Sequence, residues 1–195
     1  MKKLNLVLIT ACSVCIMQAC HSSSSSTGAA TDSTTITTAD KTTTDSSKQM
    51  AAPDTGDAAF AGKAAAGGMT EIALSKLAVQ QSTNAKIKDF ANMMITDHSA
   101  AGDKLAAIAK KEGINLPAGP DTLQQNMISD LSKKTGSDFN KAYVKQMVKD
   151  HKMTIDMFEK AQTTVKDTVL KSFITSTLPT LHKHMDAVNA LKSGM

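Results

Sequence analysis

The chain is 195 residues long and contains 41% hydrophobic and 3% aromatic residues, with a formal net charge of +4. This length leaves room for one ordinary domain and additional segments. The small charge and the lack of a basic cluster interleaved with aromatic residues argue against a nucleic-acid partner. All three cysteines lie in the first twenty residues, so a metal site in the remaining chain has to use nitrogen, oxygen or methionine sulfur ligands.

The N-terminus has the pattern of a secretory signal. Lys2 and Lys3 precede an apolar run over residues 4–17, and a small residue and Cys20 follow. A basic start and a short apolar run are typical of a cleaved signal rather than of a membrane-spanning helix. The cysteine makes the segment resemble a bacterial lipoprotein signal, in which this cysteine is lipidated and becomes the new N-terminus. We therefore predict a lipoprotein-type signal peptide over residues 1–19 and lipidation at Cys20.

Two alternatives accompany this prediction. Cys12 is the weaker lipidation candidate, because the apolar run before it is very short. The other alternative is an ordinary signal peptide that is cleaved without lipidation.

The lipoprotein pattern implies a bacterial cell envelope protein that meets the membrane through its N-terminal lipid anchor and faces the periplasm. His21 in place of Asp after the cysteine favours the outer membrane, by resemblance to known lipoprotein sorting.

Residues 20–56 form a second segment, dominated by Ser and Thr and nearly devoid of large apolar side chains. Such a segment cannot bury enough surface to offset the entropy lost on ordering. We predict a disordered linker between the lipid anchor and a globular domain.

From residue 57 onward the apolar residues recur with helical spacing. This pattern predicts five helices, over residues 57–82, 84–112 and 121–134, from a cap at Ser137 or Asp138, and over residues 166–191. Pro179 is expected to bend the last helix or to start it afresh. No segment shows the convincing two-residue alternation of a strand. The predicted fold is an all-α domain over residues 57–192, an antiparallel four-helix bundle with a short extra helix.

One phrase occurs twice in the predicted helices. An aromatic residue is followed after three residues by Met and after two more by Asp-His, first as Phe90, Met94, Asp97 and His98, then as Tyr143, Met147, Asp150 and His151. On a helix the aromatic residue, the Met and the His stack on one face. Each copy therefore directs an imidazole along the stripe that is expected to build the core.

Each long helix carries one ionisable residue in its apolar stripe and near its middle: Glu71, His98, His151 and His184. Mid-helix positions of an antiparallel bundle share one layer, so these four side chains are expected to converge on the bundle axis. Buried ionisable groups are costly unless they are paired or bind a metal. One carboxylate and three imidazoles suit a divalent transition metal, Fe, Zn or Mn, with Cu less favoured. The alternative is a metal-free hydrogen-bonded network of the same residues.

Several residues near these four in sequence could either support a metal site or be ordinary surface or core residues. Asp97 and Asp150 are candidates for accepting an imidazole N–H from a neighbouring helix, and equally for being solvated acids. His182 is expected to face away from the layer, and Glu159 is expected at the surface. Methionines at helical spacing are expected to fill the core, although thioethers are also soft ligands for Cu(I).

Several stretches together resemble a known family: Glu71-Ile-Ala-Leu-Ser-Lys-Leu-Ala78, Met94-x-x-Asp97-His98, Asp150-His151 and Leu178-Pro179-Thr-Leu181-x-x-His184. They look like the DUF4142 domain, found in bacterial envelope proteins of unassigned function with an expected ferritin-like bundle. The resemblance covers residues 57–191 and implies the bundle and the envelope location, but no activity. Di-iron members of the ferritin-like fold use Glu-x-x-His on two helices. Ile95 and Val148 stand where those Glu residues would be, which favours a single histidine-rich site over a carboxylate-bridged di-iron centre.

Two function hypotheses follow. The first is a lipid-anchored envelope bundle that binds one transition-metal ion, for metal handling or stress defence. The alternative is a non-catalytic envelope module with a metal-free His/Glu network, whose outer faces bind a protein partner that the sequence does not identify. The sequence contains no nucleophile–base pair, phosphate-binding loop or zinc-protease motif, so we predict no catalytic residues.

Overall fold

The computed structural model describes residues 53–195. The predicted signal peptide, Cys20 and nearly all of the predicted linker lie outside this part of the chain. The described residues contain no strand and form α1 (Thr55–Gln81), α2 (Ala85–Lys111), α3 (Thr122–Ser132), α4 (Gly136–Thr164) and α5 (Thr168–Ser193). None of these helices is both long and apolar enough to cross a membrane. The prediction of an all-α fold is confirmed.

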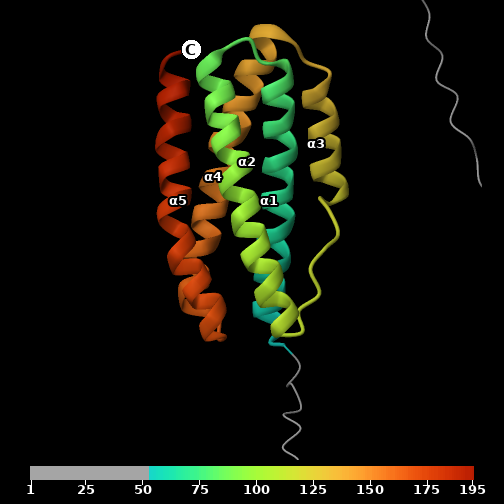
Figure 1. Cartoon of the computed structure of the whole chain (residues 1–195), viewed down its shortest axis with the longest axis vertical. Helices are drawn as coiled ribbons and strands as arrows, with labels where there is room; N and C mark the ends of the chain where they lie inside the picture. Colours follow the sequence, from blue (N-terminus) through green and yellow to red (C-terminus); the bar gives the residue numbers. More distant parts are fainter. Residues whose placement is uncertain (1–52) are drawn as a thin grey trace, which may run out of the picture. The chain divides into compact units, whose positions relative to one another are not determined.

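The four long helices pack as an antiparallel bundle (Figure 1). α1 packs against α2 and α4, and α5 packs against the same two helices, so α1 and α5 occupy opposite corners. In Figure 1, α1 and α5 run upward whereas α2 and α4 run downward. Every pair of neighbouring long helices is therefore antiparallel. The short α3 contacts α1 and α4 on the outside of the bundle and supplies the long connection between α2 and α4.

Side chains and one glycine set the helix ends. Asn84 accepts hydrogen bonds from backbone N–H groups in the first turn of α2, and Asp121 forms a capping box with Gln124 at the start of α3. The predicted cap of α4 at Ser137 or Asp138 is wrong, because α4 already begins at Gly136. Gly136 has a φ of +55°, a backbone conformation that glycine adopts without a steric penalty. The chain therefore turns directly from α3 into α4.

Pro179 does not divide α5, although the sequence predicts a bend or a new start there. The helix continues from Thr168 to Ser193 with the proline inside it. A proline removes one backbone hydrogen bond, the one its missing N–H would donate four residues back. Leu178 and Leu181 are buried on either side of Pro179, and this packing holds both halves of the helix against the core.

The core consists of two apolar clusters, each contributed by all four long helices. One cluster includes Phe60, Leu105, Ile155, Phe158, Phe173 and Leu181. The other includes Leu74, Ile87, Met94, Phe139, Tyr143, Met147 and Val188. Along each long helix the chain passes from one cluster to the other at a buried ionisable residue: Glu71, His98, His151 or His184. These four residues therefore form a polar layer between two apolar halves of the core.

Asp57 ties the start of α1 to the connection between α4 and α5, a role that the sequence does not reveal. Its side chain is only 3% exposed, and its carboxylate accepts hydrogen bonds from the backbone N–H groups of Lys166 (2.9 Å) and Asp167 (2.8 Å). Both N–H groups lie just before α5 and have no partner within that helix.

Replacing Asp57 with Ala is expected to lower the free energy of unfolding by about 1–3 kcal/mol in total, because two part-buried N–H groups lose their charged acceptor. Urea unfolding of Asp57→Ala measures this change. Asp156→Ala is the matched control, because Asp156 is an exposed residue within α4 and its replacement is expected to change stability by less than about 0.5 kcal/mol. Equal stabilities of the two variants would contradict the proposed role of Asp57.

Candidate metal centre

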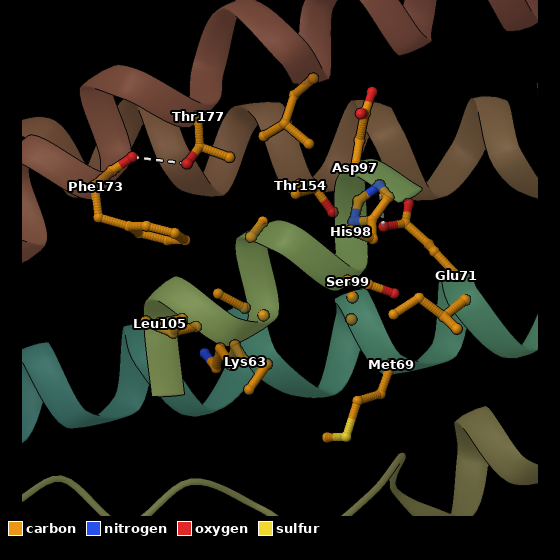
Figure 2. Close-up of a pocket in the computed structure, with 18 of the residues that line it drawn as sticks. Lys63, Met69, Glu71, Asp97, His98, Ser99, Leu105, Thr154, Phe173 and Thr177 are labelled. Atoms are coloured by element: carbon orange, nitrogen blue, oxygen red, sulfur yellow. Dashed lines mark hydrogen bonds and ion pairs between the residues drawn. The ribbon is translucent and has the colours of Figure 1, made fainter. Parts of the chain in front are cut away.

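The structure brings together the four residues of the polar layer. Glu71, His98, His151 and His184 are 2%, 7%, 0% and 1% exposed. Glu71 Oε2 lies 3.3 Å from His98 Nε2, and Glu71 Oε1 lies 3.3 Å from His151 Nδ1. One nitrogen from each of the three imidazole rings lies within 4.8 Å of the others. Figure 2 shows the carboxyl group of Glu71 directed toward the ring of His98.

Hydrogen bonds fix the tautomers of two of the histidines. His151 Nδ1 lies 2.9 Å from the carbonyl oxygen of Met147, which can only accept, so Nδ1 carries the proton. His184 Nε2 lies 2.9 Å from Asp97 Oδ2, so by the same argument Nε2 donates to the carboxylate. The remaining nitrogens, His151 Nε2 and His184 Nδ1, are buried and have no hydrogen-bond partner in the described part of the chain. Their free lone pairs are suited to a cation.

Burial determines the charge state of the layer. It lowers the pKa of His98 to about 3, with smaller contributions from the charges of His184 and His151. It also lowers the pKa of His151 to about 4, although the hydrogen bond to Met147 opposes the shift. The pKa of His184 is lowered as well, mainly by burial and against the effect of Asp97. At neutral pH all three imidazoles are therefore uncharged, which is the form that binds metals.

Glu71 responds to the same environment in the opposite direction. Burial raises its pKa well above the usual value, and the neighbouring charge of Asp150 adds to this effect. The metal-free layer therefore favours the neutral carboxylic acid. Coordination of a cation requires the carboxylate, so metal binding at this layer displaces the proton of Glu71.

The two Asp-His phrases make different contacts. Asp97 on α2 reaches across to His184 on α5, which is the first of the two alternatives that the sequence left open for this acid. Asp150 instead accepts a hydrogen bond of 2.7 Å from Gln146 one turn earlier in α4, and its Oδ2 has no partner among the described residues. Burial raises the pKa of Asp150. Only the first phrase therefore supplies a carboxylate that orients an imidazole.

The other sequence candidates lie outside the layer. His182 is exposed and faces Glu159, with 3.8 Å between His182 Nε2 and Glu159 Oε1. Met94 and Met147 are fully buried within an apolar cluster, in agreement with the core interpretation. One partner in the layer was not predicted from the sequence: the carbonyl of Met147, which accepts from His151. That partner follows from helix geometry alone, because it lies four residues before the histidine.

A metal ion requires the side chains to move closer together. Zn–N bonds are about 2.0–2.1 Å long, so two nitrogens on one ion lie at most about 4.2 Å apart. The separations among the ring nitrogens reach 4.8 Å. A bound ion therefore requires the imidazole rings to rotate toward the centre of the layer.

The fold and the layer define an all-α bundle with a buried histidine–carboxyl cluster. The family model described as a domain of unknown function (DUF4142) matches residues 40–191, and the chain therefore belongs to this family. No curated protein and no solved structure matches the chain.

Proposed function

We propose that the protein binds one divalent transition-metal ion in the polar layer, through Glu71, His98, His151 and His184. The observation that carries the proposal is the pair of buried lone pairs on His151 Nε2 and His184 Nδ1, which have no hydrogen-bond partner in the described chain. Leaving such groups unpaired costs about 1–3 kcal/mol each. A cation that both nitrogens coordinate removes this cost, and Glu71 supplies a negative charge.

The nature of the ligands favours Fe, Zn or Mn over Cu. Imidazole nitrogen and carboxylate oxygen suit these three metals, whereas Cu(I) prefers thiolate and thioether ligands. The described residues contain no cysteine. Met94 and Met147 belong to the apolar core, and Met153 is exposed.

The proposed setting is the bacterial envelope, where the bundle handles metal ions or contributes to defence against stress. The lipoprotein-like signal and Cys20 support a lipid anchor, and the Ser/Thr-rich residues 20–56 suit a tether. A ferritin-like origin is part of the same proposal. It is supported by the bundle and by the long connection between α2 and α4.

A metal-free His/Glu network in a structural or interaction module is the second candidate. The 2.9 Å bond between Asp97 and His184 and the 2.9 Å bond between His151 and the carbonyl of Met147 favour it. Such a network stabilises the bundle equally in the presence and absence of a chelator.

Elemental mass spectrometry of the purified chain, loaded separately with Fe, Zn, Mn and Cu, tests the two candidates. We expect about one ion of Fe, Zn or Mn per chain and loss of the bound ion in His98→Ala/His151→Ala. His182→Ala is the matched control, because His182 is exposed, and this variant should retain the ion. Substoichiometric binding of every metal, or equal loading of the double variant, would reject the metal site in favour of the metal-free network.

A further inference from the structure

A cavity of about 440 Å³ lies beside the polar layer, between α1, α2, α4 and α5. Its walls are largely apolar and include Ala101, Leu105, Met157, Phe158, Phe173 and Leu181. Small-molecule sites typically have volumes of about 300–1,000 Å³, apolar walls and a few polar groups. In volume and lining this cavity has the properties of such a site.

Three members of the polar layer border one end of the cavity. They are Glu71, His98 and His184, whereas His151 does not border it. Figure 2 shows Glu71 and His98 at one end and Phe173 toward the other. His98 Nε2 and His184 Nδ1 are buried atoms that lack a hydrogen-bond partner in the described residues. Because Nε2 of His184 holds the proton, its Nδ1 carries a free lone pair, and the polar end therefore offers a hydrogen-bond acceptor to a molecule that fills the apolar part.

We propose that this cavity binds a small, mostly apolar molecule with a single hydroxyl group, of the phenol type. The hydroxyl group donates to an imidazole nitrogen of the layer, and the apolar body packs between the walls. A free lone pair on a neutral imidazole requires a donor, which a hydroxyl group supplies without burying a charge. Two acids, Asp97 and Asp103, and one base, Lys63, also border the cavity, so its charge disfavours an anionic head group.

Phe158 and Phe173 favour an aromatic body. Their rings lie 6.1 Å apart at an angle of 49°, and both line the cavity. Aromatic rings stabilise one another in such tilted arrangements. This binding goes beyond the proposed metal function and does not depend on it, because the donor meets the imidazoles of the metal-free layer.

Titration calorimetry of the full chain with 4-propylphenol, in the presence of a chelator, tests the proposal. We expect saturable binding of one molecule. The matched probe is 4-propylanisole, in which a methyl ether replaces the hydroxyl group. It should bind about tenfold more weakly, because a hydrogen bond to a buried acceptor contributes about 1.4 kcal/mol. Equal binding of the two probes, or no saturable binding of either, would overturn the proposal.

A pair of variants tests whether the molecule occupies this cavity. Ala101→Leu places three additional carbons at the wall and should weaken 4-propylphenol binding at least about tenfold. Ala100→Leu adds the same atoms to the neighbouring exposed position, which does not line the cavity, and should leave binding unchanged. Equal binding by both variants would place the molecule elsewhere and reject the cavity as its site.

If Ala101→Leu does not fold, NMR spectroscopy of the unaltered protein tests whether 4-propylphenol binds in this cavity. The ring-nitrogen NMR signals of His184 or His98 should shift on addition of 4-propylphenol, and those of His182 should not, because His182 does not border the cavity. Unshifted signals of both layer histidines would reject the hydrogen bond. Since the chelator removes any metal, these results are independent of the metal-loading experiment.

Discussion

Lowering the pH from 7 to about 4 is expected to reduce the free energy of unfolding of the metal-free protein by several kcal/mol. Burial lowers the pKa of His98 to about 3 and that of His151 to about 4. In the unfolded chain both imidazoles titrate near about 6.5. Between these values the unfolded chain binds protons that the folded chain excludes, so acid favours unfolding. Each such proton changes the stability by about 1.4 kcal/mol per pH unit.

The buried carboxyl groups act in the opposite direction. Burial raises the pKa of Glu71 and of Asp150, so the folded chain holds protons that the unfolded chain has lost. Their stabilising contribution is present in acid and is lost as the pH rises through their folded-state pKa values. The histidines make the stability rise with pH up to their unfolded-state pKa of about 6.5, and the two carboxyl groups reduce the size of that rise. The stability of the metal-free protein should therefore stop rising above about pH 6.5.

Urea unfolding in a chelator between about pH 4 and pH 7.5 measures this profile. In His98→Ala/His151→Ala the rise of stability with pH should disappear, since only His184 remains to oppose Glu71 and Asp150. His182→Ala should keep the full rise, because this histidine is exposed. The measurement compares how steeply the free energy of unfolding changes with pH, so the lower overall stability of the double variant does not affect it. An equally steep rise in the double variant would contradict burial of neutral histidines as the cause.

The position of the polar layer follows from helical periodicity alone. Glu71, His98, His151 and His184 lie near the middle of their helices and within the apolar stripes. In an antiparallel bundle the middles of neighbouring helices lie at the same level. The four residues could therefore be placed in one layer without knowledge of the side-chain packing. The helix bounds were also predictable from this periodicity, because each helix extends about as far as the helical spacing of its apolar residues. The predicted start of α4 failed because a positive φ at Gly136, and not a side-chain cap, sets it.

The different roles of Asp97 and Asp150 could not be predicted from the sequence. The two residues occupy the same place in the doubled phrase, but α2 and α4 have different neighbours. α2 packs against α1 and α5, whereas α4 is also covered by α3. Asp97 meets His184, while Asp150 borders a second cavity lined by α1, α3 and α4. Which neighbour an acid meets depends on the rotation of each helix about its axis, and the repeated pattern does not encode that rotation.

Replacing Asp97 with Ala is expected to weaken metal binding by about 10- to 100-fold, the usual cost of removing a hydrogen-bond partner of a ligating histidine. The carboxylate of Asp97 accepts from His184 Nε2 at 2.9 Å, which fixes the ring orientation and leaves Nδ1 free for the ion. Without Asp97 the imidazole ring of His184 can rotate and exchange tautomers. A smaller fraction of the protein then presents His184 Nδ1 to the metal ion. Competition of the protein with a chromophoric chelator for Zn²⁺ measures the affinity.

Asp150→Ala is the matched control because it removes the acid from the other copy of the same phrase. Asp150 accepts from Gln146 and forms no hydrogen bond with a histidine in the described chain, so its loss should change the affinity far less. Urea unfolding of both variants in a chelator separates effects on binding from effects on folding. Equal losses of affinity would show that both acids act only through their charge, and that the bond between Asp97 and His184 does not orient a metal ligand.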